Sequence, residues 1–184
     1  MSNAALTKLS GKAPEGAILE TASYVGDEMV LVAREHLHAV LKLCKEDESL
    51  DFSMLTDVTA VDWLGTDPRF EVIYHLYSIE HKHRLRIKVG VPEDDAVVAS
   101  ACDLWLAANW GEREVYDLYG IRFEGHPDLR RILMYDEFIG YPLRKDYPRN
   151  GRQPLLRRPD ATPTDDQTTR LLEHSHDRRG GFNP

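Results

Sequence analysis

Hydrophobic residues recur at every second position along much of the first half of the chain. In the stretch RFEVIYHLYS, Phe70, Val72, Tyr74 and Leu76 fall on one side, and this period of two is that of a strand with one buried face. RLRIKVGV alternates in the same way, and the polar turn IEHKH between the two stretches predicts an antiparallel hairpin. The predicted strands are 18–25, 29–33, 53–63, 69–78 and 84–91.

Helical spacing replaces this alternation at two places. Leu37, Val40, Leu41 and Cys44 follow the i, i+3, i+4, i+7 pattern of an amphipathic helix. After Pro92 ends the last strand, an aspartate at 94 or 95 is expected to cap a second helix that runs to about residue 109. The residues expected to form its buried stripe are Val98, Ala101, Cys102 and Trp105.

A further short helix is predicted over residues 112–119. Acidic residues in its first turn suit the helix dipole, and Gly120 stands where a helix end favours a left-handed residue. Strands and helices are thus mixed without strict βαβ alternation, which indicates an α+β fold with a mixed or antiparallel sheet and helices packed on it. We expect a loose N-terminus over 1–16 and the α+β domain over 17–122.

Residues 121–148 lose periodicity but keep many large side chains. A disordered segment is usually depleted in such residues, and an independent domain of this length would be too small to be stable. We therefore expect an extended docking segment over 123–150, packed on its own domain or on a partner, and a flexible or wrapping tail over 151–184. The tyrosines, arginines and methionine of the docking segment are the residue types that interface cores and hot spots favour.

Composition and charge narrow the possible partners. The 184 residues carry a net charge of −8, which argues against a general nucleic-acid binder. The two cysteines, Cys44 and Cys102, are too few for an iron–sulfur cluster and are expected to be free thiols. The longest apolar run, residues 96–110, is shorter than the roughly 20 residues of a membrane helix, so membrane contact is expected only through a partner.

The sequence contains few residue patterns that could form a catalytic site. Glu112 and Glu114 could form an acid/base pair in a stand-alone hydrolase, but side chains at i and i+2 of a helix point about 200° apart. Arg113 and Asp117, at i and i+4, can pair on the helix surface instead. Nucleotide-binding glycine motifs and the nucleophile-elbow motif are absent. Three His-x-His pairs, at 36/38, 81/83 and 174/176, lack the companions of a zinc motif and are expected to be surface residues.

The stretch EREVYDLYGIRFEGHPDLRRIL resembles the signature of the 30 kDa subunit family of respiratory complex I, which is the C subunit of bacterial NADH–quinone oxidoreductase. YPLRKDYP, residues 141–148, resembles the next block of that family, and the resemblance covers about 18–150. The residues that carry the signature are Glu112, Arg113, Glu114, Asp117, Leu118, Tyr119, His126, Arg130, Ile132 and Leu133. The residues expected at a subunit interface are Glu112, Arg113, Glu114, Asp117, Tyr119, His126, Arg130, Arg131, Tyr141, Arg144 and Tyr147.

The resemblance implies a scaffold subunit in the quinone module of the peripheral arm, with no cofactor or catalytic site of its own. FMN and the Fe–S clusters would lie in partner subunits, and the 49 kDa-type subunit (the D subunit of the bacterial complex) would be the neighbour that this chain holds. It implies a peripheral location on the cytoplasmic side of the bacterial inner membrane, reached through the complex. A related complex with another electron donor, such as a membrane-bound hydrogenase or the chloroplast-type dehydrogenase, remains an alternative.

Overall fold

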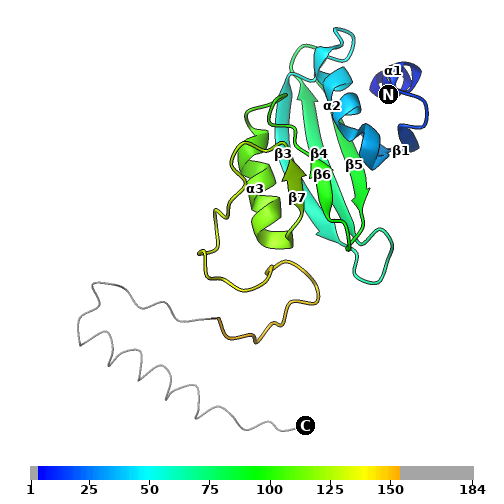
Figure 1. Ribbon diagram of the computed structural model, residues 1–184. Helices are drawn as coiled ribbons and strands as arrows, with labels where there is room; N and C mark the ends of the chain where they lie inside the picture. The colour runs from blue at the N-terminus through cyan, green and yellow to red at the C-terminus, as the bar shows by residue number, and fades with distance from the viewer. Residues whose placement is uncertain (1–3, 154–184) are drawn as a thin grey trace. The chain divides into compact units, whose positions relative to one another are not determined.

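The computed structural model describes residues 4–153. These residues contain a five-stranded mixed sheet, which Figure 1 shows. The strand order is β1-β2-β5-β4-β3, with β2 and β5 parallel and the other neighbours antiparallel. The strands are β1 Ile18–Tyr24, β2 Asp27–Val32, β3 Met54–Asp62, β4 Phe70–Ser78 and β5 His83–Val91. All five predicted strands are confirmed. The hairpin of β4 and β5 is also confirmed, because its period-two alternation reports directly on one buried sheet face.

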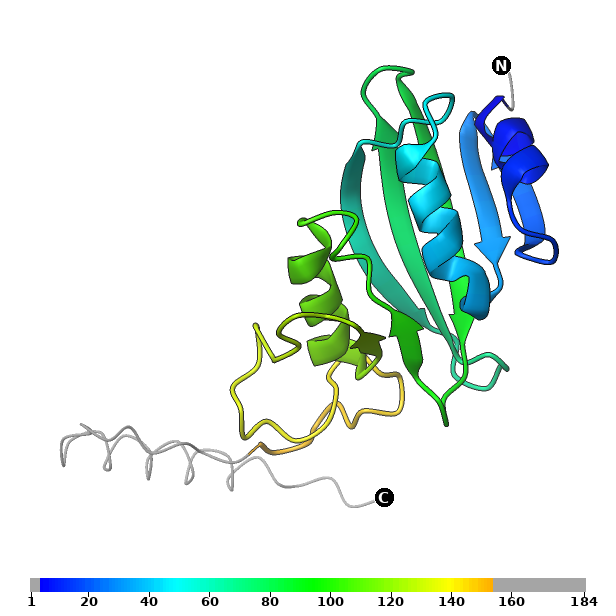
Figure 2. The same ribbon diagram turned by 45° about the horizontal axis from the view of Figure 1, so that its top comes forward.

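Helix α2, Leu37–Glu46, lies against one face of this sheet and follows a 3-10 turn, η1 Arg34–His36 (Figures 1 and 2). The predicted stripe is confirmed, since Leu37, Val40, Leu41 and Cys44 are all buried. Together with the inward residues of β2, β4 and β5 they form one hydrophobic core. Cys44 is a free thiol in that core, and burial raises its pKa to about 12.

The prediction of a helix over residues 95–109 is wrong. Residues Val97–Ala99 form strand β6, which pairs in parallel with β7, Arg122–Glu124, and helix α3 begins only at Ala108. The residues between β6 and α3 turn back, and the amide of Ala101 donates to a side chain of α3 at 2.6 Å. Val98, Ala101 and Trp105 are buried as predicted, but the helix-like spacing of these positions arises from a strand and a turn.

The N-terminus also differs from the loose segment expected. Ala4–Lys12 form helix α1, in which Leu6 and Leu9 are buried. Lys12 forms an ion pair with Asp47 at the end of α2, at 2.5 Å. Burial of the two leucines outweighs the weak helix propensity of the serine and glycine in this helix.

Helix α3, Ala108–Tyr119, ends at Gly120 as the sequence predicts. Gly120 adopts φ +77° and its amide donates to the carbonyl of Tyr116 at 2.9 Å. A Cβ built at this position would lie 2.5 Å from the ring of Tyr141. The glycine therefore serves both the helix end and the close approach of the segment that follows.

Replacing Gly120 with alanine is expected to lower the free energy of unfolding by about 2–5 kcal/mol. The left-handed backbone contributes about 1–2 kcal/mol, and crowding against Tyr141 contributes about 1–3 kcal/mol. Gly26 is a matched control, because its φ is +91° and nothing lies within 4 Å of a built Cβ. Urea denaturation of both variants isolates the Tyr141 contact, and equal losses would show that this contact is not tight.

Candidate subunit interface

The segment after β7 contains no helix or strand over residues 125–150 and lies beside the C-terminal end of α3 (Figure 2). It belongs to the compact unit formed by residues 1–151. The extended, aperiodic character predicted for it is confirmed. Most of the predicted tail, from residue 154 onward, lies outside the described residues.

Asp117 of α3 holds the middle of this segment. Its carboxylate is fully buried and accepts hydrogen bonds from the amides of Ile132, Leu133 and Met134 at 3.1, 2.7 and 2.9 Å. Arg131 adds an ion pair at 3.0 Å. Burial alone would raise the pKa of Asp117, but the three amides and Arg131 outweigh it and hold the pKa below its usual value.

The predicted surface pair of Arg113 with Asp117 is therefore wrong. Arg113 instead donates to the carbonyls of Arg130 and Arg131 at 3.1 and 3.2 Å, and its guanidinium lies over the ring of Trp110. Because three amides of a distant segment satisfy Asp117 more completely than one exposed side chain can, the tertiary contact replaces the local one.

Two arginines brace the segment by stacking on aromatic rings. The Arg131 guanidinium lies over Phe138 and Tyr141 and donates to the Gly140 carbonyl at 3.0 Å. The guanidinium of Arg144 lies over Tyr141 at 4.7 Å, and its Nε donates to the carbonyl of Tyr119 at 2.6 Å. Planar guanidinium groups suit such combined stacking and hydrogen bonding, so these contacts fix the path of an otherwise irregular chain.

The end of the segment is tied to the sheet by a buried ion pair. Arg69, just before β4, makes two hydrogen bonds of 2.9 Å to Asp62 at the end of β3. Arg69 also pairs with Asp146, and the amide of Lys145 donates to Asp62 at 2.7 Å. Arg69 is the main cause that lowers the pKa of Asp62.

Sequence reasoning missed this group. The residues next to Asp62 and Arg69 in the sequence form no motif that would indicate an ion pair. Asp146 lies 77 residues after Arg69. The available signal is that an acid closes β3 and a base opens β4, which places them together at one end of an antiparallel pair.

Glu112 and Glu114 point apart, as the helical geometry predicts. Glu112 is fully buried and accepts hydrogen bonds from the Ser100 hydroxyl and the Ala101 amide, both at 2.6 Å. Burial raises the pKa of Glu112. Glu114 is exposed, so the two carboxylates do not face a common substrate and the hydrolase alternative loses its acid/base pair.

The remaining predicted interface residues divide between the inside and the outside of the segment. His126 accepts a hydrogen bond from the Asp128 amide at 3.0 Å, and Tyr147 stacks on Phe138. Arg130 forms an exposed ion pair with Asp128. Most of the predicted residues therefore brace the segment against its own domain, and Glu114 and Arg130 are the exposed ones.

A second set of residues, which the sequence prediction did not include, forms the apolar outer surface of the segment. Each is a large hydrophobic side chain with at least about a third of its surface exposed. We call this set the outer surface; it consists of Leu133, Tyr135, Ile139 and Leu143. Exposed apolar side chains mark a protein–protein contact where they form a contiguous patch, so these residues make the segment a candidate interface.

Two His-x-His pairs are engaged in intrachain contacts. His38 lies 2.9 Å from Asp103, and the rings of His81 and His83 stack and contact backbone carbonyls of the loop after α2. The pair 174/176 lies outside the described residues. Over residues 4–153, no helix is long and apolar enough to cross a membrane.

Comparison with known proteins connects this architecture to a family. The model of the family described as "Respiratory-chain NADH dehydrogenase, 30 Kd subunit" matches residues 30–153. The chain is 53% identical over 150 residues to the C subunit of NADH-quinone oxidoreductase from Trichlorobacter lovleyi, covering 81% of this chain and 91% of that protein. It is 51% identical over 149 residues to the corresponding protein of Geotalea uraniireducens, covering 81% and 89%.

Solved structures share the fold. A trypsin-resistant fragment of Nqo5 aligns with a TM-score of 0.60 and 33% identity, covering 68% of this chain and 99% of the fragment. A chain of the membrane-bound sulfane sulfur reductase, an archaeal respiratory membrane complex, aligns with a TM-score of 0.70 at 22% identity, covering 97% and 93%. The latter likeness concerns the fold alone.

The α+β fold, together with the family match and the named relatives, defines a subunit of a multi-subunit respiratory assembly. Within that class, the chain belongs to the family of 30 kDa subunits of the respiratory-chain NADH dehydrogenase, complex I. Its partners are therefore other subunits of such a complex, in which FMN and Fe–S clusters belong to other subunits.

Proposed function

We propose that this chain is a scaffold subunit of the peripheral arm of a proton-translocating NADH:quinone oxidoreductase, in the quinone module. It supplies no cofactor and no catalytic residue, and it supports electron transfer from NADH, through FMN and Fe–S centres of its neighbours, to quinone. Its place is on the cytoplasmic side of the membrane, held there by the complex. Support comes from the family match over residues 30–153 and from relatives that are named as the C subunit of NADH-quinone oxidoreductase.

The neighbour proposed for the docking segment is the 49 kDa-type subunit. The observation that carries this proposal is that the two sides of the segment differ. Backbone amides of the segment donate inward to Asp117, whereas the side chains of the outer surface are large, apolar and exposed. A segment held in one conformation before docking loses less conformational entropy when it binds. The predicted interface residues that point inward therefore act by pre-organising the segment.

Replacing Leu133 and Leu143 together with serine is expected to weaken capture of the 49 kDa-type subunit about 100-fold. The two side chains are 57% and 49% exposed, and burial of each in an interface contributes about 1.5 kcal/mol. The measurement is binding of the full-length chain to the co-expressed, affinity-tagged 49 kDa-type subunit. Leu19→Ser is the matched control, since Leu19 is 63% exposed on β1, at the far edge of the sheet.

Equal capture of the double variant and the wild type would overturn the docking proposal. A variant at Arg131 or Tyr141 is less informative, because both residues brace the segment itself. Circular dichroism of the Leu133/Leu143 variant separates lost docking from lost folding, and an unchanged spectrum with weak capture supports the proposal.

A further inference from the structure

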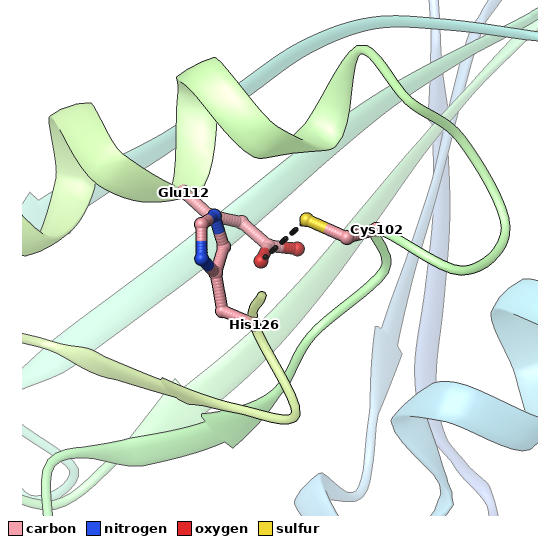
Figure 3. Close-up of side chains that lie close together, drawn as sticks. All are labelled: Cys102, Glu112 and His126. Carbon is pink, nitrogen blue, oxygen red and sulfur yellow. Dashed lines mark hydrogen bonds between the residues drawn. The ribbon is translucent and has the colours of Figure 1, made fainter. Parts of the chain in front are cut away.

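Three side chains of types that can bind a metal ion come from separate parts of the chain and lie close together beside α3. Cys102 lies in the turn after β6, Glu112 on α3 and His126 in the turn after β7 (Figure 3). One ligand atom from each lies within 4.8 Å of the others. The Cys102 Sγ and a carboxylate oxygen of Glu112 are 3.4 Å apart, a spacing that two ligands of one small cation can adopt with little rearrangement.

The charge of this cluster is unbalanced. The Glu112 side chain is fully buried, and its described hydrogen bonds come from a hydroxyl, an amide and a thiol, none of them cationic. No lysine or arginine among residues 4–153 forms an ion pair with it. A buried carboxylate without a cation is costly, and burial accordingly raises the pKa of Glu112. A divalent cation bound here would favour the ionised carboxylate.

A second observation at the same place is the hydroxyl of Tyr74. Tyr74 on β4 is fully buried, and its hydroxyl has no hydrogen-bond partner among the described residues. Burial raises the pKa of Tyr74, and Glu112 and Cys102 raise it further because both lie close to it. Buried hydroxyls are nearly always bonded to protein or water, and a water on an ion bound beside Tyr74 would supply a partner for this one.

We propose that Cys102, Glu112 and His126 bind a zinc ion, with Tyr74 hydrogen-bonded to a water in the fourth position. Thiolate, imidazole and carboxylate together are a ligand set for Zn²⁺, whereas Mg²⁺ and Ca²⁺ require oxygen ligands throughout. The ion would link the turns after β6 and β7 to α3. It would therefore anchor the start of the docking segment, as Asp117 anchors its middle.

Binding requires two local changes. The Cys102 thiol, whose pKa burial raises to about 11, must release its proton, which the cation promotes. One His126 nitrogen must give up its present bond: Nδ1 accepts from the Asp128 amide at 3.0 Å, and Nε2 lies 3.2 Å from the Asn109 carbonyl. Of the three ligands, His126 also lines a surface hollow, together with Gly125 and Leu129.

The test is titration of the purified, chelator-treated full chain with Zn²⁺, and with Co²⁺ as a spectroscopic probe. We expect one tightly bound ion per chain and a thiolate-to-cobalt charge-transfer band. Cys102→Ser should abolish that band and weaken Zn²⁺ binding more than about 100-fold, since loss of a supporting residue around a metal site already costs about 10–100-fold. His126→Gln should weaken binding similarly.

Two controls keep the outcome decisive. The double variant His174→Gln/His176→Gln removes a histidine pair that could chelate ions adventitiously, and it should leave the tight site intact. Cys44→Ala removes the other thiol and should leave the charge-transfer band unchanged. Absence of tight binding, or tight binding that survives Cys102→Ser and disappears with the His174/His176 pair, would overturn the zinc site.

Discussion

The Asp117→Ala variant is expected to lose about 3–5 kcal/mol of unfolding free energy, the usual cost of removing one partner from a buried ion pair. The substitution leaves the amides of residues 132–134 without their acceptor. It also leaves Arg131, whose side chain is only 15% exposed, without its counter-ion. Urea denaturation measures the loss, and faster amide hydrogen exchange at 132–134 locates it in the segment.

Asp128→Ala provides the matched control. Asp128 pairs with Arg130 at 3.0 Å, but both side chains are more than half exposed. An exposed pair of this kind contributes about 0–1 kcal/mol. A loss for Asp117→Ala no greater than that of the control would show that the segment holds its conformation without the buried carboxylate.

Replacing Arg69 with methionine is also expected to cost about 3–5 kcal/mol. The side chains of Arg69 and Asp62 are 4% and 1% exposed, so the variant leaves Asp62 buried with the Lys145 amide as its remaining described donor. Adding Asp62→Leu to Arg69→Met should recover part of the loss, because the unpaired buried charge is then removed. Denaturation of both single variants and the double variant gives the coupling between the two residues.

The loss of unfolding free energy caused by Arg69→Met should also depend on pH. Hydrogen bonds from Arg69 are the main cause that holds the pKa of folded Asp62 below 3.8, its ordinary value. A lowered folded pKa contributes stability above pH 3.8 that is lost as the pH falls through the folded pKa. Without Arg69 the largest cause of the lowered pKa is lost, so the difference in unfolding free energy between wild type and variant should shrink as the pH falls toward and below 3.8. A difference that stays constant with pH would contradict this assignment.

Lys88→Met is the control for the loss of a less buried pair. Lys88 and Glu71 lie on the neighbouring strands β5 and β4 and form an ion pair at 3.0 Å, with side chains 23% and 15% exposed. We expect a loss of unfolding free energy of about 1 kcal/mol or less. The contrast with Arg69 tests whether burial decides the size of the effect.

The sequence by itself determined the elements whose burial repeats along the chain. Strands β4 and β5 and helix α2 were predicted from periodicity, because regular geometry places successive buried residues at fixed intervals. The divergence of Glu112 and Glu114 followed from the same geometry. Strand β3 was predicted from its β-branched residues. The signature around α3 indicated the family, and the comparisons confirmed it.

Only the tertiary structure decided which face of the docking segment turns inward. The segment has no period, and its acceptors lie far away in sequence: Asp117 is 15 residues from Ile132, and Asp62 is 83 residues from Lys145. Residues 97–99 became a strand because β7 offered a partner, although their spacing with Ala101 and Trp105 suited a helix. Where local preference is weak, hydrogen bonds to distant backbone and buried carboxylates decide the conformation, and no local pattern records them.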